Sequence, residues 1–377
     1  MNVRENVALA AYTTLGVGGP ARWLAEAATE EEVREALSFA ALHELPLLVL
    51  GGGSNVLVAD SGFPGVVLRV ALRGVRTTTE GPVEVLEAGA GESWDEFVAL
   101  CVRGGLGGLE CLSGIPGTVG GTPVQNVGAY GQEVAAVLRC VRVLDRATGE
   151  ARTLTRYECG FGYRASVFNT AARDRYVVLR VAFALPRDAA PHLQYRDVRE
   201  YFAARSGPAA GPPTLAEARE AVLAIRRRKA MLLEPGDPDS RSAGSFFKNP
   251  VVSAADCARI ESAAGPGLPR YAVNGTTSEA PAGAHGTAPA AGAPTPSAPS
   301  PSLFKLPAAW LIERSGFARG HTRGRAGISS KHALAIVNRG GATAAEILEL
   351  AREIRGGVEA KFGVRLEPEP ILVGCEL

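Results

Sequence analysis

Short apolar runs alternate with amphipathic stretches through the first half of the chain. Acidic residues at 30–32 follow Thr29, and apolar residues then return at helical spacing, which predicts a helix beginning near Thr29. The unbroken apolar run at 45–50 predicts a strand that is covered on both faces and ends at Gly51. Further β runs surround a predicted helix at 94–102, and they lie at 56–60, 65–70, 83–91, 137–154 and 175–185. This order predicts an α+β nucleotide-binding unit.

Beyond Pro186 the spacing of apolar residues becomes helical, and it predicts helices at 216–232 and 343–362 with a strand at 334–338 between them. A second, separate domain is therefore expected. Residues 275–302 fit neither half, because they contain no aromatic residue and no Val, Ile, Leu or Met to offset the entropy of ordering the chain. We expect a disordered surface insertion there, and a Pro-rich arm that docks a partner is the alternative.

Length and charge narrow the class of protein. A chain of 377 residues suggests two or three domains, and 40 Lys and Arg residues against 39 Asp and Glu residues give no overall field that would attract nucleic acid or an acidic membrane. We therefore expect a small-molecule partner. The six cysteines form no C-x-x-C pair, which argues against a zinc site or a disulfide framework and favours reduced, intracellular thiols. No signal peptide or membrane span is predicted, so a cytoplasmic protein is expected.

Three glycine clusters could each be a ligand-binding loop or a simple turn. Residues 16–21 satisfy G-x-G-x-x-A, but no clear strand precedes them and Pro20 lies where the dinucleotide-binding helix would begin, so we interpret this match as accidental. Residues 51–55 follow a predicted strand, where glycines can turn successive N–H groups toward a phosphate. The dense cluster at 114–121 leads into 125–131 and allows a ligand to approach the backbone closely. A single glycine-rich loop of this kind more often forms a tight turn than a ligand-binding site.

Seven motifs together carry a resemblance that no single one would establish. They run in order along nearly the whole chain, and the sequence resembles the UDP-N-acetylenolpyruvoylglucosamine reductase (MurB) family, in the subtype with a mobile-loop tyrosine. The motifs are TTLGVGGPA, LGGGSNVLV, SGIPGTVGGTPVQNVGAYG, FGYRASVF, GSFFKNP, AAWLIERSGF and LEPEP, at 13–21, 50–58, 113–131, 161–168, 244–250, 308–317 and 366–370.

The resemblance implies an α+β fold, with a two-lobed FAD-binding domain of the vanillyl-alcohol oxidase (PCMH) type and a C-terminal α+β substrate-binding domain. The expected divisions are two FAD-binding lobes, a mobile loop and connection, the substrate-binding domain with its insertion, and a C-terminal segment that returns to the active site. Their bounds are 1–69, 70–190, 191–213, 214–363 and 364–377.

The resemblance also implies a reaction. NADPH reduces the FAD, and the flavin then reduces the enolpyruvyl ether of UDP-N-acetylglucosamine to UDP-N-acetylmuramate, a peptidoglycan precursor. A monomer with no nucleic-acid partner and no membrane partner is expected. The residues that would bind FAD lie in the second and third glycine clusters, and they are Gly51, Gly52, Gly53, Ser54, Asn55, Ile115, Pro116, Gly117, Val119, Gly120, Asn126, Gly128 and Ala129.

Three residues are expected to carry the chemistry. The resemblance assigns Ser245 as the proton donor to the enolate that forms on hydride transfer, and a serine can do this only if it is held close and in line. Arg164 would stabilise the charged carboxylate through its fork of donors. Glu369 makes sense beside an anion if it is protonated or if it orients Arg164. By residue type alone, Ser245 would usually be a turn or cap hydroxyl and the other two ordinary surface charges.

Four residues are expected at the sugar nucleotide or the NADPH, and they are Tyr195, Arg226, Lys229 and Asn249. The basic run at 226–229 would otherwise be a solvated helix face. His321 and His332 are interpreted as structural. Pro370 departs from the branched aliphatic residue that is more frequent in the family, which weakens the assignment of Glu369. Two other classes stay open on the residues: a flavin oxidase that uses oxygen, and a non-catalytic nucleotide-binding relative.

Overall fold

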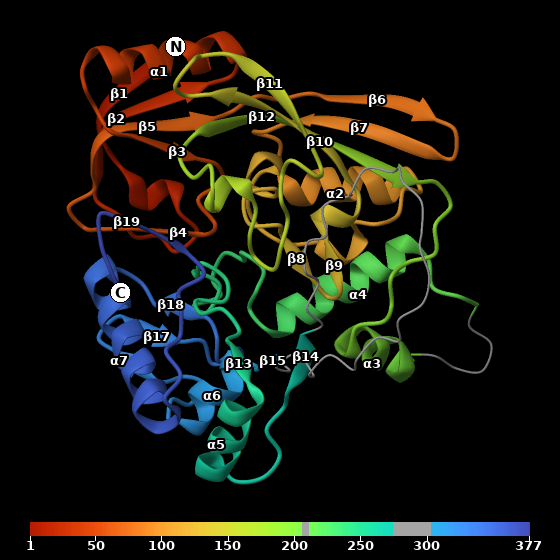
Figure 1. Ribbon diagram of the computed structural model, residues 1–377, viewed down its shortest axis with the longest axis vertical. Helices are drawn as coiled ribbons and strands as arrows, with labels where there is room; N and C mark the ends of the chain where they lie inside the picture. Colours follow the sequence, from red (N-terminus) through yellow and green to blue (C-terminus); the bar gives the residue numbers. More distant parts are fainter. Residues whose placement is uncertain (206–210, 274–302) are drawn as a thin grey trace, which may run out of the picture.

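The computed structural model describes residues 1–205, 211–273 and 303–377. The chain begins with a four-stranded sheet in the order β1-β2-β5-β3, in which β2, β5 and β3 run parallel and β1 runs antiparallel to β2. Helix α1 (Glu30–Leu42) packs against this sheet, near the N-terminus in Figure 1. The four strands are β1 (Asn2–Ala8), β2 (Pro20–Ala27), β3 (Leu47–Leu50) and β5 (Phe63–Val70).

A second, antiparallel sheet follows in the order β11-β10-β12-β7-β6 and lies across the top of Figure 1. Helix α2 (Trp94–Arg103) packs beneath it through Trp94 and Phe97, whose rings contact Phe183 of β12. These aromatic rings belong to the largest buried cluster, which extends from the first sheet into the second. The strands are β6 (Val75–Glu80), β7 (Val83–Gly89), β10 (Leu138–Asp145), β11 (Ala151–Thr155) and β12 (Tyr176–Pro186).

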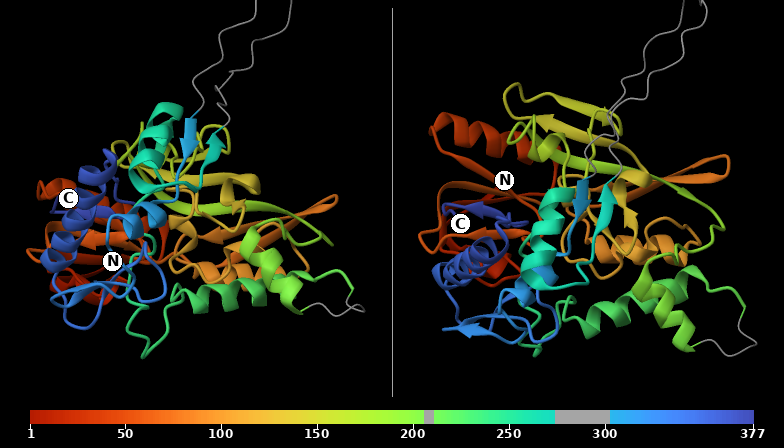
Figure 2. Two further views of the ribbon diagram at one scale, coloured as in Figure 1. Left: turned by 90° about the horizontal axis from the view of Figure 1, so that it is seen from below. Right: turned by 60° about the horizontal axis from the view of Figure 1, so that its bottom comes forward.

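The C-terminal part contains small sheets and most of the remaining helices, and it lies beside the first sheet in Figures 1 and 2. The small sheets are ordered β13-β15-β14 and β16-β17-β18. Two further pairs involve strands from the first half of the chain: β19 pairs with β4, and β8 pairs with β9. The helices are α3 (Arg196–Arg205), α4 (Leu215–Arg228), α5 (Ala254–Ala264), α6 (Ala308–Arg314) and α7 (Ala344–Phe362). The strands are β4 (Val56–Val58), β8 (Gly128–Ala129), β9 (Gln132–Glu133), β13 (Val251–Ser253), β14 (Tyr271–Val273), β15 (Leu303–Lys305), β16 (Thr322–Arg323), β17 (Ala326–Ile328), β18 (Ile336–Asn338) and β19 (Ile371–Val373). Short 3-10 turns are η1 (Leu9–Tyr12), η2 (Glu110–Leu112), η3 (Val119–Gly121), η4 (Val134–Ala136) and η5 (Val167–Asn169).

The C-terminal part is attached to the first sheet through backbone and side-chain contacts. Asp60 accepts hydrogen bonds from the N–H groups of Ala344 and Ala345 at 2.8 and 2.9 Å, which caps the start of α7 with a negative charge. Leu15 and Leu57, from the first 60 residues, are fully buried in the core of the C-terminal part. The two parts therefore share one continuous packing.

Helix ends agree with the sequence patterns because local chemistry fixes them. Thr29 and Thr343 each form a capping box with a glutamate three residues later, at the starts of α1 and α7. Helix α7 ends at Gly363, whose φ of +61° lies in the left-handed region that glycine adopts easily. The predicted helices at 94–102, 216–232 and 343–362 and the strand at 334–338 are confirmed, with ends that differ by a few residues.

Two expectations about strands were wrong. The run at 45–50 forms β3, but β3 is an edge strand with residues 47–49 only partly buried, because nothing pairs on its outer side. A strand, β1, does precede Gly16, although the next element after Gly19 is β2 rather than a helix. The G-x-G-x-x-A match is therefore accidental, as expected. The predicted insertion at 275–302 lies outside the described residues.

Candidate functional site

The glycine clusters at 51–55 and 114–121 lie against each other. A Cβ built on Gly52 would lie 2.6 Å from the Cα of Gly117, and one built on Gly117 would lie 2.8 Å from the hydroxyl of Ser54. A side chain at either position would push the two loops apart. Glycine is therefore required here by the approach of two backbones, and the loops form one continuous surface.

The N–H groups of these two loops differ in what they bind. Among the described residues, the N–H groups of Gly52, Gly53 and Ser54 donate no hydrogen bond. Those of Val119 and Gly120 donate to the carbonyl oxygens of Glu92 and Ala90 at 2.9 Å. The first loop thus offers free donors to an anion, whereas this part of the second loop is tied to the second sheet.

The remaining residues predicted to bind FAD lie along the same surface. Asn126 is 2% exposed, and its side-chain amide bonds Glu133, the oxygen of Gly162 and the N–H of Ala135. Its side chain therefore fixes the local turn, and only its backbone is left for a ligand. Ile115 packs partly against the main core, Pro116 lines a small cavity next to Gly244, and Gly128 and Ala129 form β8.

The C-terminal segment returns to the first glycine loop. Strand β19 pairs in parallel with β4, which directly follows the loop. Asn55, the last residue of that loop, donates from Nδ2 to Gln125 at 2.5 Å and to the backbone oxygen of Glu369 at 3.2 Å. One amide thus joins the two glycine clusters and the C-terminal segment.

The segment that carries Ser245 pairs with the same C-terminal residues. The N–H of Glu369 donates to the oxygen of Phe246 at 2.9 Å, and the N–H of Lys248 donates to the oxygen of Glu367 at 2.9 Å. Phe246 is fully buried and fixes the backbone next to the serine. Ser245 and Glu369 are therefore held one position apart across two paired segments.

Arg164 and Glu369 form an ion pair with Nε of the arginine 3.0 Å from Oε1 of the glutamate. The Nε–H group is not directed at that oxygen and has no hydrogen-bond partner, although it is buried. Arg164 has a φ of +53°, which is unusual for a residue with a side chain, and its Nη1 donates to the oxygen of Gly128 at 2.9 Å. The guanidinium is thus held at the edge of the second glycine cluster with one donor free.

Glu369 is a carboxyl group in a poorly solvated place. Its side chain is 12% exposed, and burial raises its pKa above the ordinary value of 4.5, although the charges of Arg164 and Lys248 act in the opposite direction. The protonated form is therefore more populated than in water. This agrees with either role that the sequence left open for Glu369.

The hydroxyl of Ser245 makes no side-chain hydrogen bond within the described part of the chain, and the residue is partly buried. Gly244, directly before it, has a φ of +75°, and a Cβ there would meet no atom within 4 Å. The turn that presents the serine thus opens onto free space. A cap or turn hydroxyl would instead be bonded to nearby backbone.

The four predicted substrate residues do not all lie free. Lys229 ends α4 and lies 2.5 Å from Oδ2 of Asp197, and Tyr195 packs edge to face on Tyr130 with ring centroids 5.4 Å apart. Asn249 accepts from the N–H of Ala308 at 2.9 Å and so caps α6, and its side chain also hydrogen-bonds Tyr163.

Arg226 departs from the expectation of a solvated helix face. It is 6% exposed, its Nη2 donates to the oxygen of Met231 at 2.7 Å, and its Nε is buried without a hydrogen-bond partner. The reason is that α4 packs against η2 and turns this side of the helix inward. Arg226 lines the small cavity that Pro116 and Gly244 also line.

His332 is held neutral near the same basic residues. Burial lowers its pKa to about 4, and the charges of Lys229 and Arg226 act in the same direction. A histidine in this state is neither a cation nor a proton donor at neutral pH. His321 packs its ring on Phe317 with centroids 5.7 Å apart, and it has a structural role.

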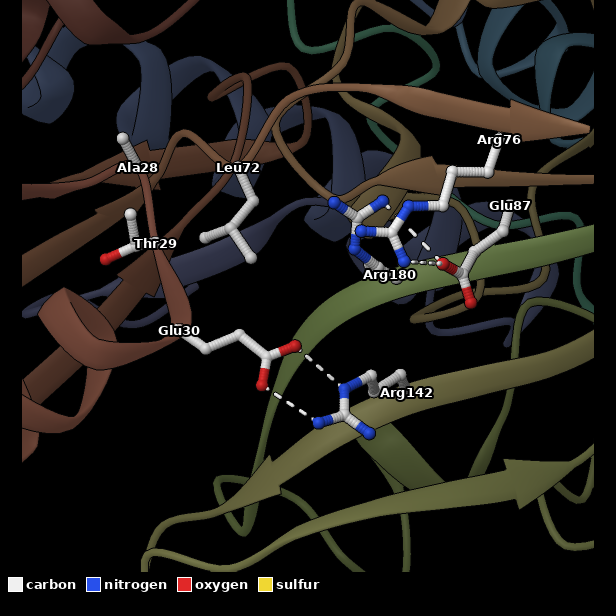
Figure 3. Close-up of a pocket in the computed structure, with 8 residues that line it drawn as sticks. All are labelled: Ala28, Thr29, Glu30, Leu72, Arg76, Glu87, Arg142 and Arg180. Carbon is white, nitrogen blue, oxygen red and sulfur yellow. Dashed lines mark hydrogen bonds and ion pairs between the residues drawn. The ribbon is translucent and has the colours of Figure 1, made fainter.

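A larger cavity, of about 450 Å³, lies elsewhere, between α1 and the second sheet (Figure 3). Its arginines are engaged by carboxylates: Arg142 forms two hydrogen bonds with Glu30 at 2.8 and 2.9 Å, and Arg76 and Arg180 both approach Glu87. None of the predicted site residues lines it. We therefore interpret it as an ionic junction between the start of α1 and the second sheet.

Sequence reasoning missed three residues that organise this region: Gln125, Tyr130 and Asp197. Each lies within a quoted motif or beside a predicted site residue, but none has a residue type that points to chemistry by itself. The left-handed φ of Tyr130, +49°, is a signal that only coordinates supply. Within the described residues no cluster of potential metal ligands occurs, and no helix has the length and apolar character to cross a bilayer.

Comparisons with known proteins agree with this geometry. Residues 237–373 match the family described as UDP-N-acetylenolpyruvoylglucosamine reductase, C-terminal domain, and residues 21–155 match an FAD binding domain. The chain is 50% identical over 98% of its length to a UDP-N-acetylenolpyruvoylglucosamine reductase of Saccharopolyspora erythraea, covering 95% of that protein. It is 46% identical over 99% of its length to one of Thermobifida fusca, covering 98% of it.

A solved structure extends the likeness to the fold. The UDP-N-acetylenolpyruvylglucosamine reductase of Thermus caldophilus superposes with a TM-score of 0.62 at 29% identity, over 99% of this chain and 100% of that one. The predicted fold class, an α+β protein with an FAD-binding part and a C-terminal part, is confirmed by these matches.

Proposed function

The chain belongs to the UDP-N-acetylenolpyruvoylglucosamine reductase family and is an FAD-binding oxidoreductase, and from that premise we propose that it reduces UDP-N-acetylglucosamine enolpyruvate to UDP-N-acetylmuramate with NADPH, for peptidoglycan synthesis. The observation that carries the mechanistic proposal is the contact of Arg164 with Glu369, next to backbone pairing that joins the segment carrying Ser245 to the segment carrying Glu369. These three residues come from distant parts of the sequence.

The glycine loops fit the pyrophosphate-bearing FAD. The N–H groups of Gly52, Gly53 and Ser54, which donate no hydrogen bond among the described residues, suit a phosphate, and the close approach of Gly52 to Gly117 brings the backbones of the two loops together. When bound, FAD supplies hydride transfer between NADPH and the enolpyruvyl group. The other residues proposed to bind FAD are Gly51, Asn55, Ile115, Pro116, Val119, Gly120, Asn126, Gly128 and Ala129.

Ser245 is the proposed proton donor to the substrate carbon that gains negative charge. Its hydroxyl has no hydrogen-bond partner among the described residues and faces an open turn, so it is available to a ligand. A serine alkoxide is a strong base in water, so it needs nearby donors and positive charge to form transiently. Lys248 and Arg164 supply positive charge near this segment, as their effect on Glu369 indicates.

Arg164 is proposed to bind the substrate carboxylate through its guanidinium, whose Nε–H has no hydrogen-bond partner among the described residues. Glu369 then has two tasks. It keeps the guanidinium in place at 3.0 Å, and in its protonated form it can donate a hydrogen bond to the substrate without adding a second negative charge.

Tyr195, Lys229 and Asn249 are proposed to contact the sugar nucleotide. Lys229 exposes 36% of its side chain, and Tyr195 is 43% exposed, so both are accessible to a ligand. Arg226 is proposed to act from the buried side, through the small cavity that it lines. This differs from a surface contact with phosphate.

An anaerobic titration tests the proposed function. The purified yellow protein should lose its flavin absorbance with NADPH and regain it when UDP-N-acetylglucosamine enolpyruvate is added. Turnover with oxygen in place of the sugar nucleotide serves as the control for an oxidase. A spectrum that NADPH never bleaches, or that the sugar nucleotide does not restore, would overturn the proposal.

The proposal also includes a cytoplasmic location, which the six free cysteines support because reduced thiols suit that compartment, and a monomeric state. The domain bounds of 1–69, 70–190, 191–213, 214–363 and 364–377 remain part of it. Sedimentation of the holoenzyme would test the monomer directly, because a dimer would sediment with twice the mass.

A further inference from the structure

The ammonium group of Lys229 is held from two sides. Oδ2 of Asp197, in the first turn of α3, lies 2.5 Å away, and the ring centroid of Tyr130 lies 5.9 Å away. An ammonium has three N–H donors, so this arrangement leaves at least one free. With 36% of the lysine side chain exposed and only 15% of the aspartate, the free donor faces solvent while the carboxylate is largely shielded.

Asp197 lies two residues after Tyr195, on the same segment. The N–H of Val198 donates to the oxygen of Tyr195 at 3.1 Å, so the two residues are tied together through the start of α3. The ring of Tyr195 packs at 87° on Tyr130, the same ring that faces Lys229. The pair between Asp197 and Lys229 therefore fixes the position of Tyr195 as well as that of the ammonium.

Tyr130 connects this arrangement to the second glycine cluster. It follows Ala129, and its hydroxyl lies beside the guanidinium of Arg226, one turn before Lys229 on α4. Burial raises the pKa of Tyr130 to about 12, so the phenol stays neutral, with its ring beneath Lys229 and its hydroxyl hydrogen-bonded to Arg226. The ring of Tyr130 thus joins the second glycine cluster to helix α4, which is distant from it in the sequence.

We propose that Asp197 is a positioning residue for substrate binding: it orients the ammonium of Lys229 toward the phosphates of the sugar nucleotide and closes the Tyr195 segment over them. This inference rests on the proposed function and specifies how its substrate site is assembled. The carboxylate does not touch the substrate; it acts through Lys229 and Tyr195. Without the charge of Asp197, the protein should bind the sugar nucleotide more weakly, while the rate of flavin reduction by NADPH should stay unchanged.

Asp197→Asn is the sharpest test, because it keeps the shape and removes only the charge. We expect KM for UDP-N-acetylglucosamine enolpyruvate to rise about tenfold, as for the loss of a half-buried charged hydrogen bond. The rate of flavin reduction by NADPH and the flavin content should stay within about twofold of the parent. Glu234→Gln is the matched control, since it breaks the exposed pair with Arg227, the helix residue two before Lys229, at 2.7 Å.

A double-mutant cycle with Lys229→Met separates the outcomes. If Asp197 acts through the lysine, Asp197→Asn should add less than about twofold to KM in the Lys229→Met background. Full additivity, or an unchanged KM in Asp197→Asn alone, would overturn the inference. An unchanged KM in Lys229→Met would instead contradict the assignment of Lys229 in the proposed function. An equal rise of KM in Glu234→Gln would mean that the effect is only loosening of the helix end.

Discussion

Two buried carboxyl groups, Glu110 and Glu369, are treated in opposite ways by their surroundings. Glu110 is 1% exposed and accepts hydrogen bonds from the N–H groups of Gly108 and His192, both at 2.8 Å, and from Nε2 of Gln132 at 2.7 Å. Glu369 is also mostly buried, but no hydrogen-bond donor among the described residues is aligned on its side chain: the Nε of Arg164 forms an ion pair with it, and Lys248 acts on it through its charge.

The difference separates a carboxylate that holds structure from one available for chemistry. Three donors aimed at Glu110 join η2, the turn around β9 and the segment before Tyr195. Their combined effect is to fix the backbone from which Tyr195 projects. The carboxyl group of Glu369 is neither fully solvated nor fully hydrogen-bonded, so its protonation can respond to a ligand. Satisfaction of hydrogen bonds, rather than burial, distinguishes the two.

The largest effect should come from Ser245, whose hydroxyl, like the carboxyl group of Glu369, lacks an aligned hydrogen bond within the described residues. Ser245→Ala should slow reoxidation of the reduced flavin by the enolpyruvyl substrate by about 10³-fold, because a positioned proton donor is lost. Flavin reduction by NADPH should change less than about threefold. Stopped-flow absorbance measures both half-reactions, and equal loss in both would mean that the serine is only structural.

On the satisfied side, Glu110→Ala should cost about 3 kcal/mol of unfolding free energy, since three buried donors would lose their acceptor. Chemical denaturation of the flavin-loaded protein measures this, with Glu234→Gln as a surface control that should change stability by less than about 0.5 kcal/mol. A loss below about 1 kcal/mol would show that these hydrogen bonds do not hold the segment.

Glu369→Gln should reverse that pattern. We expect reoxidation by the substrate to slow about 30-fold, because an uncharged amide holds Arg164 more weakly than the carboxyl group does. The unfolding free energy should fall little, since no well-aligned hydrogen bond is removed. A variant that loses stability as Glu110→Ala does, while keeping its rate, would break the comparison.

The smallest effect concerns pH. Because burial raises the pKa of Glu369 in the folded protein, the folded state binds more protons than the unfolded chain between 4.5 and the folded pKa. The contribution of Glu369 to stability is therefore fully present below pH 4.5 and is lost as pH rises through the folded pKa. Relative to the parent, Glu369→Gln should gain stability as pH rises across that window, in denaturation curves measured at several pH values. A gain on lowering pH would contradict the sign.

The sequence predicted what local chemistry decides. Helix α1 was readable because Thr29 and the acidic first turn act within a few residues, and α7 because Thr343 does the same. Strand β1 was missed because it is an exposed edge strand whose burial pattern lacks a clear apolar face. Its partner β2 begins at a proline that was considered only as a helix breaker.

The site could be predicted only where motifs carried it. The loops and the three chemistry residues came from the resemblance, but spacing alone could not pair Arg164 with Glu369. The burial of Arg226 depends on how α4 packs on η2, which no local pattern encodes. Asp197 was missed for the same reason, because its partner lies on another helix.

The backbone oxygen of Glu369 that Asn55 contacts belongs to a residue made 314 positions later. On a ribosome that adds about 5–20 residues per second, it emerges roughly 15–60 s after Asn55. Until then β4 lacks its parallel neighbour β19, and the guanidinium of Arg164 lacks its carboxyl partner. The two large sheets can therefore form before the C-terminal segment is made, and under the proposed function the chain becomes active toward the sugar nucleotide only after translation has passed Val373.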